Sequence, residues 1–323
     1  MNLLYYVDLL GYSNRIDAFR RAIRECVRPG DRVLDVGTGL GTFAFFATQS
    51  GASSVVAVDS NPVVHLAQAV AAANGLADAI EFVRGSLPGT PLEGDFDVVV
   101  FEDFPTSFLD QRTYALVKHL HDNHLSPGGR MIPRSARLSL ALVHSRSDRE
   151  IFPPGEAEPV RFGVDWSGVL PFLANAPRQV SLRPDEIRGE PAQGPCLPLC
   201  PVPRAPALRV EGRWDVAEPG VVDGLALWFD LEVFEGGWIS NEPKSETEPW
   251  GQWLLPVAPL LVVAAGQTVE ASVWRETLEN GGPGWLGWEC RVGDDVRRGH
   301  EFAGRIAGPE DLTGSAEGPT NGS

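Results

Sequence analysis

The segment that decides the fold is Val33–Gly41, with the sequence Val-Leu-Asp-Val-Gly-Thr-Gly-Leu-Gly. A short apolar run ends in three alternating glycines, and a helical pattern follows over Phe43–Ser50. Glycine lets the backbone turn tightly and approach a bound molecule without a Cβ clash. The segment therefore predicts a strand, over 32–36, that runs into a nucleotide-binding turn and then a helix.

Strand and helix patterns alternate on both sides of this segment. Arg15–Val27 repeats apolar residues at helical spacing and stops at Pro29-Gly30, while Pro62–Asn74 is an Ala-rich helical stretch. Further strands are predicted at Ser54–Val58, Ile80–Val83 and Asp97–Phe101. The last of these is apolar through its centre, as in a parallel sheet covered on both faces. Residues 1–134 are therefore expected to form a doubly wound, Rossmann-like α/β domain.

The pattern changes beyond Pro133, where short apolar or alternating runs lie between Gly and Pro clusters. They are Ala136–Val143, Gly224–Phe234, Gln252–Val257, Thr268–Trp274 and Trp288–Val292. Residues 135–307 are expected to form an antiparallel, barrel-like domain. Within it, the Pro-rich segment Asn175–Pro206 predicts a loop or an extended arm. Residues 308–323 lack apolar periodicity and are expected to be a disordered tail.

Charge and hydropathy limit the partners. The 323 residues include 27 Lys and Arg against 43 Asp and Glu, a net charge of −16. This balance argues against nucleic acid or an anionic membrane surface and favours a cationic substrate. No apolar run approaches the ~20 residues that a membrane helix needs. The first residues lack a signal-peptide pattern, so we expect a cytoplasmic location. The scarcity of lysine, with only Lys118 and Lys244, suggests a bacterial genome rich in GC.

The strand after the glycine loop ends in a second acidic residue. Asp59 lies 24 residues after Asp35, where a carboxylate can accept hydrogen bonds from ribose hydroxyls. These features favour an adenosine-containing ligand, although a glycine turn needed only for packing is an alternative. Position 42 is Thr42, so the third glycine of the dinucleotide fingerprint is missing. The spacing G-x-G-x-G resembles motif I of the class I S-adenosyl-L-methionine (SAM) methyltransferases. The resemblance implies a SAM site made by Asp35, Gly37, Thr38, Gly39, Gly41, Asp59 and Ser60.

Further stretches resemble the protein arginine methyltransferases, from about residue 6 to residue 300. Leu9-Leu10, Arg15, Phe19 and Ala22-Ile23 are similar to that family's M-L-x-D-x-x-R-x-x-x-Y-x-x-A-I helix, and Asp97–Phe104 to its D-x-x-x-S-E-W stretch. Arg161–Ser167 resembles the dimerisation arm's Y-G-F-D-M-S. Gly224–Asp230 and Trp238–Pro243 resemble the barrel's G-F-x-x-W-F-D and L-S-T-S-P.

This resemblance implies an enzyme that transfers methyl from SAM to a guanidine or arginine nitrogen of a peptide or small molecule, for example in natural-product biosynthesis. Arg15 is expected to bind the SAM carboxylate, the alternative being a solvated helix arginine. Glu102 is expected to hold the acceptor guanidinium. A homodimer is expected through an arm at about 160–206 with Asp165 and Trp166, the alternative being a loop packed on its own barrel. Alternative functions are methylation of an acceptor other than a guanidine and a non-catalytic role.

The chain departs from the family pattern where substrate is handled. The family has a second glutamate about nine residues after the first, and here Gln111 occupies that place. Asp110 or Asp103 is expected to substitute for it. Asp110 is equally well explained as a helix N-cap. The family's T-H-W loop becomes Glu248-Pro249-Trp250, in which Trp250 is expected either to wall the acceptor pocket or to pack in the barrel, and Glu248 could restore negative charge.

The residues expected to bind the cofactor also depart from the family pattern. The family's G-x-x-E becomes Gly85-Ser86-Leu87-Pro88, which leaves Ser86, Leu87 or backbone groups to bind adenine. Only fourteen residues precede Arg15, so most of the aromatic lid helix is not expected. Tyr5 and Tyr6 are expected to pack over the cofactor instead, with Tyr6 where the family has a histidine.

Two smaller clusters carry weaker signals. His119, His121 and His124 suit the negative end of a helix better than a metal site, so no metal is expected. Cys196 and Cys200 lack a second Cys/His pair at zinc-site spacing, so reduced thiols are favoured over a disulfide or half a zinc site.

Overall fold

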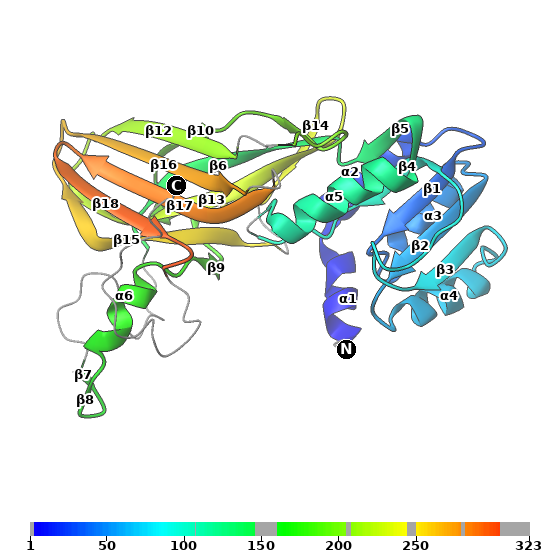
Figure 1. The fold of residues 1–323 in the computed structure, drawn as a ribbon, viewed down its shortest axis with the longest axis horizontal. Coiled ribbons are helices and arrows are strands. Elements are labelled where there is room, and N and C mark those ends of the chain that lie inside the picture. The colour runs from blue at the N-terminus through cyan, green and yellow to red at the C-terminus, as the bar shows by residue number, and fades with distance from the viewer. Residues whose placement is uncertain are drawn as a thin grey trace.

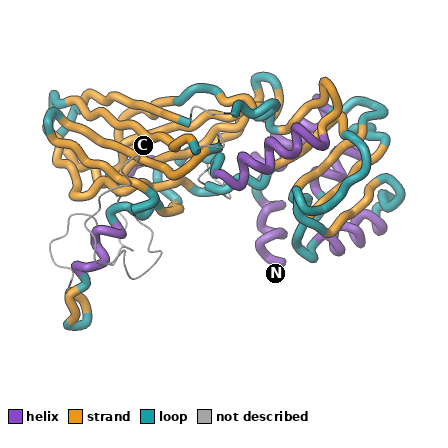
Figure 2. The backbone as a smooth tube through the Cα atoms, in the orientation of Figure 1, coloured by secondary structure: helices purple, strands orange, loops and turns teal. Residues whose placement is uncertain are grey.

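The computed structural model describes residues 3–106, 108–145, 160–204, 208–243, 250–278 and 282–303. Most of its helices lie around one sheet, whereas the remaining strands form a long antiparallel unit beside it (Figures 1 and 2). Buried residues of both parts belong to one continuous apolar core. Glu248, Pro249 and the expected tail at 308–323 lie outside the described residues.

The first part is a parallel sheet of five strands in the order β3-β2-β1-β4-β5. Its strands are β1 (Arg32–Val36), β2 (Ser54–Asp59), β3 (Ile80–Arg84), β4 (Phe96–Phe101) and β5 (Leu125–Ile132). Chain order reverses between β1 and β4, which makes this the switch point where open α/β sheets bind ligands. In the β1–β4 register Val36 pairs with Phe101, so the glycine loop and Glu102 leave the sheet side by side.

In the part of the chain that the structure describes, five helices accompany this sheet, and all but the first bury an apolar face. They are α1 (Leu3–Gly11), α2 (Ser13–Cys26), α3 (Thr42–Gln49), α4 (Val64–Ala73) and α5 (Gln111–His124). On α2 the buried face includes Phe19 and Ile23, and the Phe19 ring stacks on Phe43 with centroids 4.8 Å apart. α1 has no buried residue. Among the described helices, none has the length and apolar character needed to cross a membrane.

The second part consists of two antiparallel sheets. The larger sheet follows the order β10-β6-β13-β15-β9, and in addition β11 pairs with β6 and β14 pairs with β13. The smaller sheet follows the order β12-β16-β17-β18. The strands are β6 (Ser135–Val143), β9 (Arg178–Val180), β10 (Ile187–Gln193), β11 (Leu197–Pro198), β12 (Arg209–Asp215), β13 (Gly220–Phe234), β14 (Gly237–Ser240), β15 (Gln252–Val263), β16 (Thr268–Thr277), β17 (Pro283–Val292) and β18 (Asp295–His300). The expected α/β domain followed by an antiparallel domain is confirmed.

One strand was not predicted, and one expectation for the fold was wrong. β5 follows α5 directly and pairs with β4, although the sequence predicts no strand at 125–132. The Pro-rich segment 175–206 looked like loop or arm throughout, yet β10 within it pairs with β6. In both cases tertiary pairing overrides a local composition that disfavours strands.

A shorter segment does project from the sheets (Figure 1). It contains the hairpin β7 (Val160–Arg161) and β8 (Val164–Asp165), the 3-10 turn η1 (Ser167–Val169) and α6 (Leu170–Leu173). The hairpin pairs Val160 with Asp165. We call residues 160–173 the arm segment.

Candidate active site

The glycine loop is held from behind by Asp35, at the end of β1. Its carboxylate is 1% exposed and accepts hydrogen bonds from Thr38 Oγ1 at 2.6 Å and from the Ala44 N–H at 3.1 Å. These bonds tie the loop to the first turn of α3. Burial raises the pKa of the Asp35 carboxyl to about 7, against the lowering effect of both hydrogen bonds.

The loop itself needs glycine. Gly37, Gly39 and Gly41 have φ of 77°, 55° and 86°, a region that L side chains rarely adopt. A Cβ on Gly41 would also lie 2.8 Å from the Phe45 ring. Asp59, at the end of β2, accepts from the Gly39 N–H at 2.8 Å and from the Asn61 N–H at 2.7 Å. Its carboxylate is thereby fixed beside the loop.

Glu102 follows β4 and forms an ion pair with Arg15 from α2. Their side chains are only 15% and 7% exposed. Burial raises the pKa of Glu102, and the Arg15 guanidinium opposes that increase. Arg15 is therefore a buried partner of Glu102, and its interpretation as a solvated helix arginine was wrong.

These groups border a cavity of about 480 Å³ between α1, α5, the glycine loop and the Trp250 segment. It is lined by Tyr5, Tyr6, Leu9, Leu10, Arg15, Val36, Gly37, Thr38, Gly39, Leu40, Thr42, Phe43, Val58, Asp59, Ser60, Asn61, Gly85, Ser86, Leu87, Pro88, Glu102, Asp103, Phe104, Arg112, Ala115, Leu116 and Trp250. Tyr6 lies over the loop, 3.3 Å from where a Cβ on Gly39 would stand. Tyr5 meets Tyr6 edge to face.

Trp250 both lines the cavity and packs in the core. It is 7% exposed and meets Phe229 edge to face with centroids 5.4 Å apart. Its carbonyl accepts hydrogen bonds from Thr106 Oγ1 and from Gln179 Nε2. Thr106 belongs to the loop after β4, so this bond connects the two parts of the molecule. Trp250 is thus both a core residue and part of the cavity lining.

Asp103 and Asp110 differ sharply in placement. Asp103 lines the cavity, and both burial and the nearby charge of Asp59 raise its pKa, whereas Arg112 opposes the increase. Asp110 does not line the cavity: it caps α5 by accepting from the Thr113 N–H at 2.8 Å. Asp110 was predicted as a catalytic residue, but it lies outside the cavity lining. Its interpretation as the N-cap of α5 is confirmed.

Asp35 and Gly41 also lie outside the cavity lining, one buried behind the loop and the other at the start of α3. Every other predicted site residue lines the cavity. Sequence reasoning did not find Leu9 or Leu10 as cavity residues, nor Arg112, Ala115 and Leu116 of α5. The helical spacing of the last three was a usable signal, but which face of α5 turns inward depends on its packing.

Comparison with known proteins shows which proteins the chain is similar to. Residues 33–129 match a family described as a methyltransferase domain. An arginine N(omega)-methyltransferase of Streptomyces achromogenes is 27% identical over 82% of this chain and 74% of its own length. Protein arginine N-methyltransferase 6 of Xenopus laevis is 26% identical over 77% and 76%, respectively. The chain is a methyltransferase that is similar to arginine methyltransferases over most of its length.

Solved structures show the same fold in other methyltransferases. The Trypanosoma brucei PRMT1 enzyme-prozyme heterotetrameric complex with AdoHcy superposes with a TM-score of 0.76 at 19% identity, covering 90% of this chain and 96% of that one. Arabidopsis thaliana protein arginine methyltransferase 10 gives 0.71 at 20% identity, covering 91% and 96%.

The cavity of this methyltransferase fits SAM on structural grounds. The positive-φ glycine loop allows close approach of a ligand, and the carboxylate of Asp59 is fixed by two N–H groups at the end of β2. A carboxylate in that place can accept from ribose hydroxyls. Arg15 offers a cation at the same edge of the sheet. At the adenine end, Ser86 and Leu87 are present where an acidic side chain is lacking.

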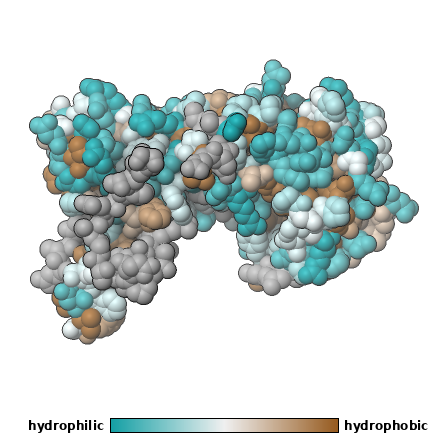
Figure 3. Space-filling model, in the orientation of Figure 1, coloured by the Kyte–Doolittle hydropathy of each residue, from teal (hydrophilic) through white to brown (hydrophobic). Residues whose placement is uncertain are grey.

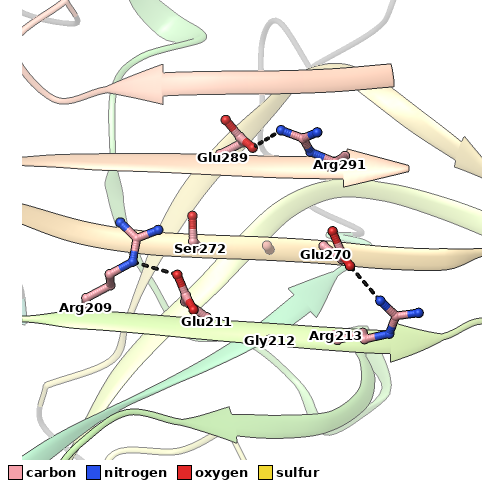
Figure 4. Close-up of a pocket in the computed structure, with 9 residues that line it drawn as sticks. Arg209, Glu211, Gly212, Arg213, Glu270, Ser272, Glu289 and Arg291 are labelled. Atoms are coloured by element: carbon pink, nitrogen blue, oxygen red, sulfur yellow. Dashed lines mark hydrogen bonds and ion pairs between the residues drawn. The ribbon is translucent and has the colours of Figure 1, made fainter. Parts of the chain in front are cut away.

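Another hollow lies on the outer face of the smaller antiparallel sheet (Figure 4). Its charged side chains are paired: Arg209 with Glu211, Arg213 with Glu270, and Arg291 with Glu289. Ion pairs of this kind are usual on the solvent-exposed face of a sheet, so these side chains do not indicate a ligand site.

The smaller clusters have simple surroundings. His121 and His124 lie in the last turn of α5, and His119 Nε2 is 3.2 Å from His124 Nε2. In the described part of the chain, no group of three or more His, Cys, Asp or Glu side chains is arranged to hold a metal ion. Cys196 and Cys200 are free thiols, so the disulfide alternative was wrong.

Proposed function

We propose that this methyltransferase transfers a methyl group from SAM to a guanidine nitrogen of arginine or a related small molecule. The observation that carries the proposal is the position of Glu102. Its buried carboxylate emerges beside the glycine loop, paired with Arg15, in the cavity that Trp250 also lines. A carboxylate enclosed in this way suits a cationic acceptor next to the cofactor.

The cofactor is proposed to lie along the glycine loop. SAM supplies an electrophilic methyl group on a sulfonium centre. Asp59 would accept from the ribose hydroxyls, Arg15 would face the cofactor carboxylate, and Tyr6 would cover the loop. Ser86 and Leu87 would border the adenine.

The acceptor must be held and its charge localised, because a guanidinium has a pKa above ~12 and its nitrogens are poor nucleophiles. Glu102 would bind the nitrogens that do not react, leaving the attacking nitrogen free to lose its proton. Asp103 is the better candidate for the missing second glutamate, because it lines the cavity whereas Asp110 and Gln111 do not. Trp250 would exclude water from the acceptor.

The names of the relatives support the acceptor chemistry. The Streptomyces protein is named for arginine and the Xenopus protein for protein arginine, so a guanidine is common to both. A role in natural-product biosynthesis in a bacterial cytoplasm is compatible with the Streptomyces relative and belongs to the proposal.

The direct test is mass spectrometry after incubation with isotopically labelled SAM and either arginine-containing peptides or small guanidines. We expect label on a guanidine nitrogen. Glu102→Gln is expected to lower turnover by about 100-fold or more while S-adenosylhomocysteine still binds in calorimetry. Exposed Glu81 provides the matched control, Glu81→Gln, which should retain activity.

The second candidate function is methylation of a neutral hydroxyl or amine, which the departures at Gln111 and at Glu248-Pro249 favour. In that case Glu102→Gln would leave turnover nearly unchanged, and no label would appear on guanidines.

We also propose a homodimer formed through the arm segment. Phe162 is 94% exposed and Val164 51% exposed at the tip of the β7–β8 hairpin. Figure 3 shows hydrophobic residues beside hydrophilic ones at the end of the projection. Apolar side chains displayed in this way favour a protein partner. The T. brucei relative is a heterotetrameric complex, which supports association within this fold.

A further inference from the structure

We propose that Arg112 binds a carboxylate of the methyl acceptor, so that the acceptor is a free guanidino acid rather than an arginine residue inside a peptide. The inference rests on the proposed function and specifies its substrate class.

Arg112 is placed for this role by α5. It occupies the first turn of the helix, directly after Gln111 and two residues beyond the N-cap Asp110. Ala115 and Leu116 follow at the i+3 and i+4 positions, and all three line the cavity together with Glu102 and Trp250. The start of a helix also favours a bound anion, because its N–H dipoles point toward the N-terminus.

Arg112 has no protein partner in the described part of the chain: no ion pair or hydrogen bond from its guanidinium is present there, and the residue is exposed. The other cavity arginine, Arg15, is buried in its pair with Glu102. Arg112 is thus the cavity cation left for a ligand, within electrostatic range of Asp103.

The charges of the cavity match a zwitterion. Asp59 is engaged by two backbone N–H groups and Glu102 by Arg15. In the proposed function Glu102 and Asp103 hold the acceptor guanidinium, so Arg112 remains for an anionic group of the same molecule. An arginine within a peptide has no carboxylate at its α-carbon and would bring its cation toward Arg112 without compensation. A free amino acid supplies a carboxylate for the planar fork of Arg112, which binds carboxylates through two parallel hydrogen bonds.

The competing ligand for Arg112 is the carboxylate of SAM itself, and the test must separate the two. L-Arginine, agmatine and an Nα-acetyl-arginine amide present the same guanidine with and without a free carboxylate. Steady-state kinetics on the three compounds and calorimetry with S-adenosylhomocysteine would be measured for wild type, Arg112→Ala and Arg24→Ala. Arg24 is an exposed arginine of α2 outside the cavity, so its variant controls for the loss of one positive charge.

We expect wild type to prefer L-arginine in kcat/KM by about 10-fold or more over the compounds without a carboxylate, since one charge-assisted pair is lost with them. Arg112→Ala should raise KM for L-arginine by about 10- to 100-fold, remove the preference, and leave S-adenosylhomocysteine affinity unchanged. Arg24→Ala should behave as wild type.

Equal use of all three compounds by wild type would overturn this inference and leave the proposed function intact. Weaker S-adenosylhomocysteine binding by Arg112→Ala with the preference retained would assign Arg112 to the cofactor and also overturn it. If no guanidine were methylated, the proposed function would be wrong and this inference with it.

Discussion

The guanidinium of Arg15 and the carboxylate of Glu102 form an ion pair across 87 positions of the chain. Arg15 comes from the helix that precedes the parallel sheet, and Glu102 from the end of β4. Each side chain is nearly buried, so each depends on the other for compensation of its charge. The pair therefore links folding of the N-terminal helix to the geometry of the cavity.

Removal of Arg15 should destabilise the protein more at high pH than at low pH. In Arg15→Ala the Glu102 carboxylate would be buried without a partner, at a cost of about 3–5 kcal/mol in the free energy of unfolding at pH 8. The loss should shrink as pH falls, because burial already raises the pKa of Glu102 and protonation removes the buried charge. Urea denaturation at pH 5 and pH 8 measures both values.

The double variant Arg15→Ala with Glu102→Gln is the control for that experiment. It should recover most of the lost stability at pH 8, because no buried charge remains. A loss that is the same at both pH values, and is not relieved in the double variant, would show that the pair contributes through packing alone.

Asp35 should make the fold less stable as pH rises. Its pKa of about 7 in the folded protein exceeds the ordinary value of 3.8, so between these pH values the folded state binds more protons than the unfolded state. Stability from this group is present below pH 4 and is lost as pH approaches 7, on the order of a few kcal/mol. The free energy of unfolding of wild type minus that of Asp35→Asn should therefore fall across this window. A difference independent of pH would contradict the prediction.

Thr106 should act on the acceptor through Trp250. Its hydroxyl donates to the Trp250 carbonyl, so Thr106→Val removes one of the two bonds that fix this segment. We expect KM for the acceptor to rise several-fold, as a hydrogen bond of about 1 kcal/mol implies, with kcat and S-adenosylhomocysteine affinity nearly unchanged. Thr106→Ser keeps the hydroxyl and should restore KM. A fall in cofactor affinity would place the effect elsewhere in the cavity.

The arm segment should control the oligomeric state. Phe162→Asp introduces a charge at a side chain that is 94% exposed, where a dimer would bury it. We expect light scattering to show a dimer for wild type and a monomer for this variant. Val262→Asp alters another exposed apolar residue, outside the arm segment, and should remain dimeric. A monomeric wild type at micromolar concentration would refute the proposed homodimer.

Local sequence signals predicted the glycine loop and the strand before it well. The glycine spacing and Asp59 located the loop, and β1 was predicted with its observed bounds, because strand, turn and helix signals there depend on neighbouring residues. Asp110 illustrates the limit. A short acidic residue before a helix is a good N-cap in any fold, so its place near Glu102 in the chain said nothing about its place in the cavity.

By itself, the sequence determined the alternation of strands and helices and the glycine turn. Tertiary structure alone decided that β5 and β10 join sheets, that Arg15 pairs with Glu102, and that Arg112 rather than Gln111 faces the cavity. The physical reason is how far apart along the chain the interacting residues lie. Backbone turns and helix caps involve residues a few positions apart, whereas strand pairing, burial of charge and the inward face of α5 depend on segments that meet only after folding.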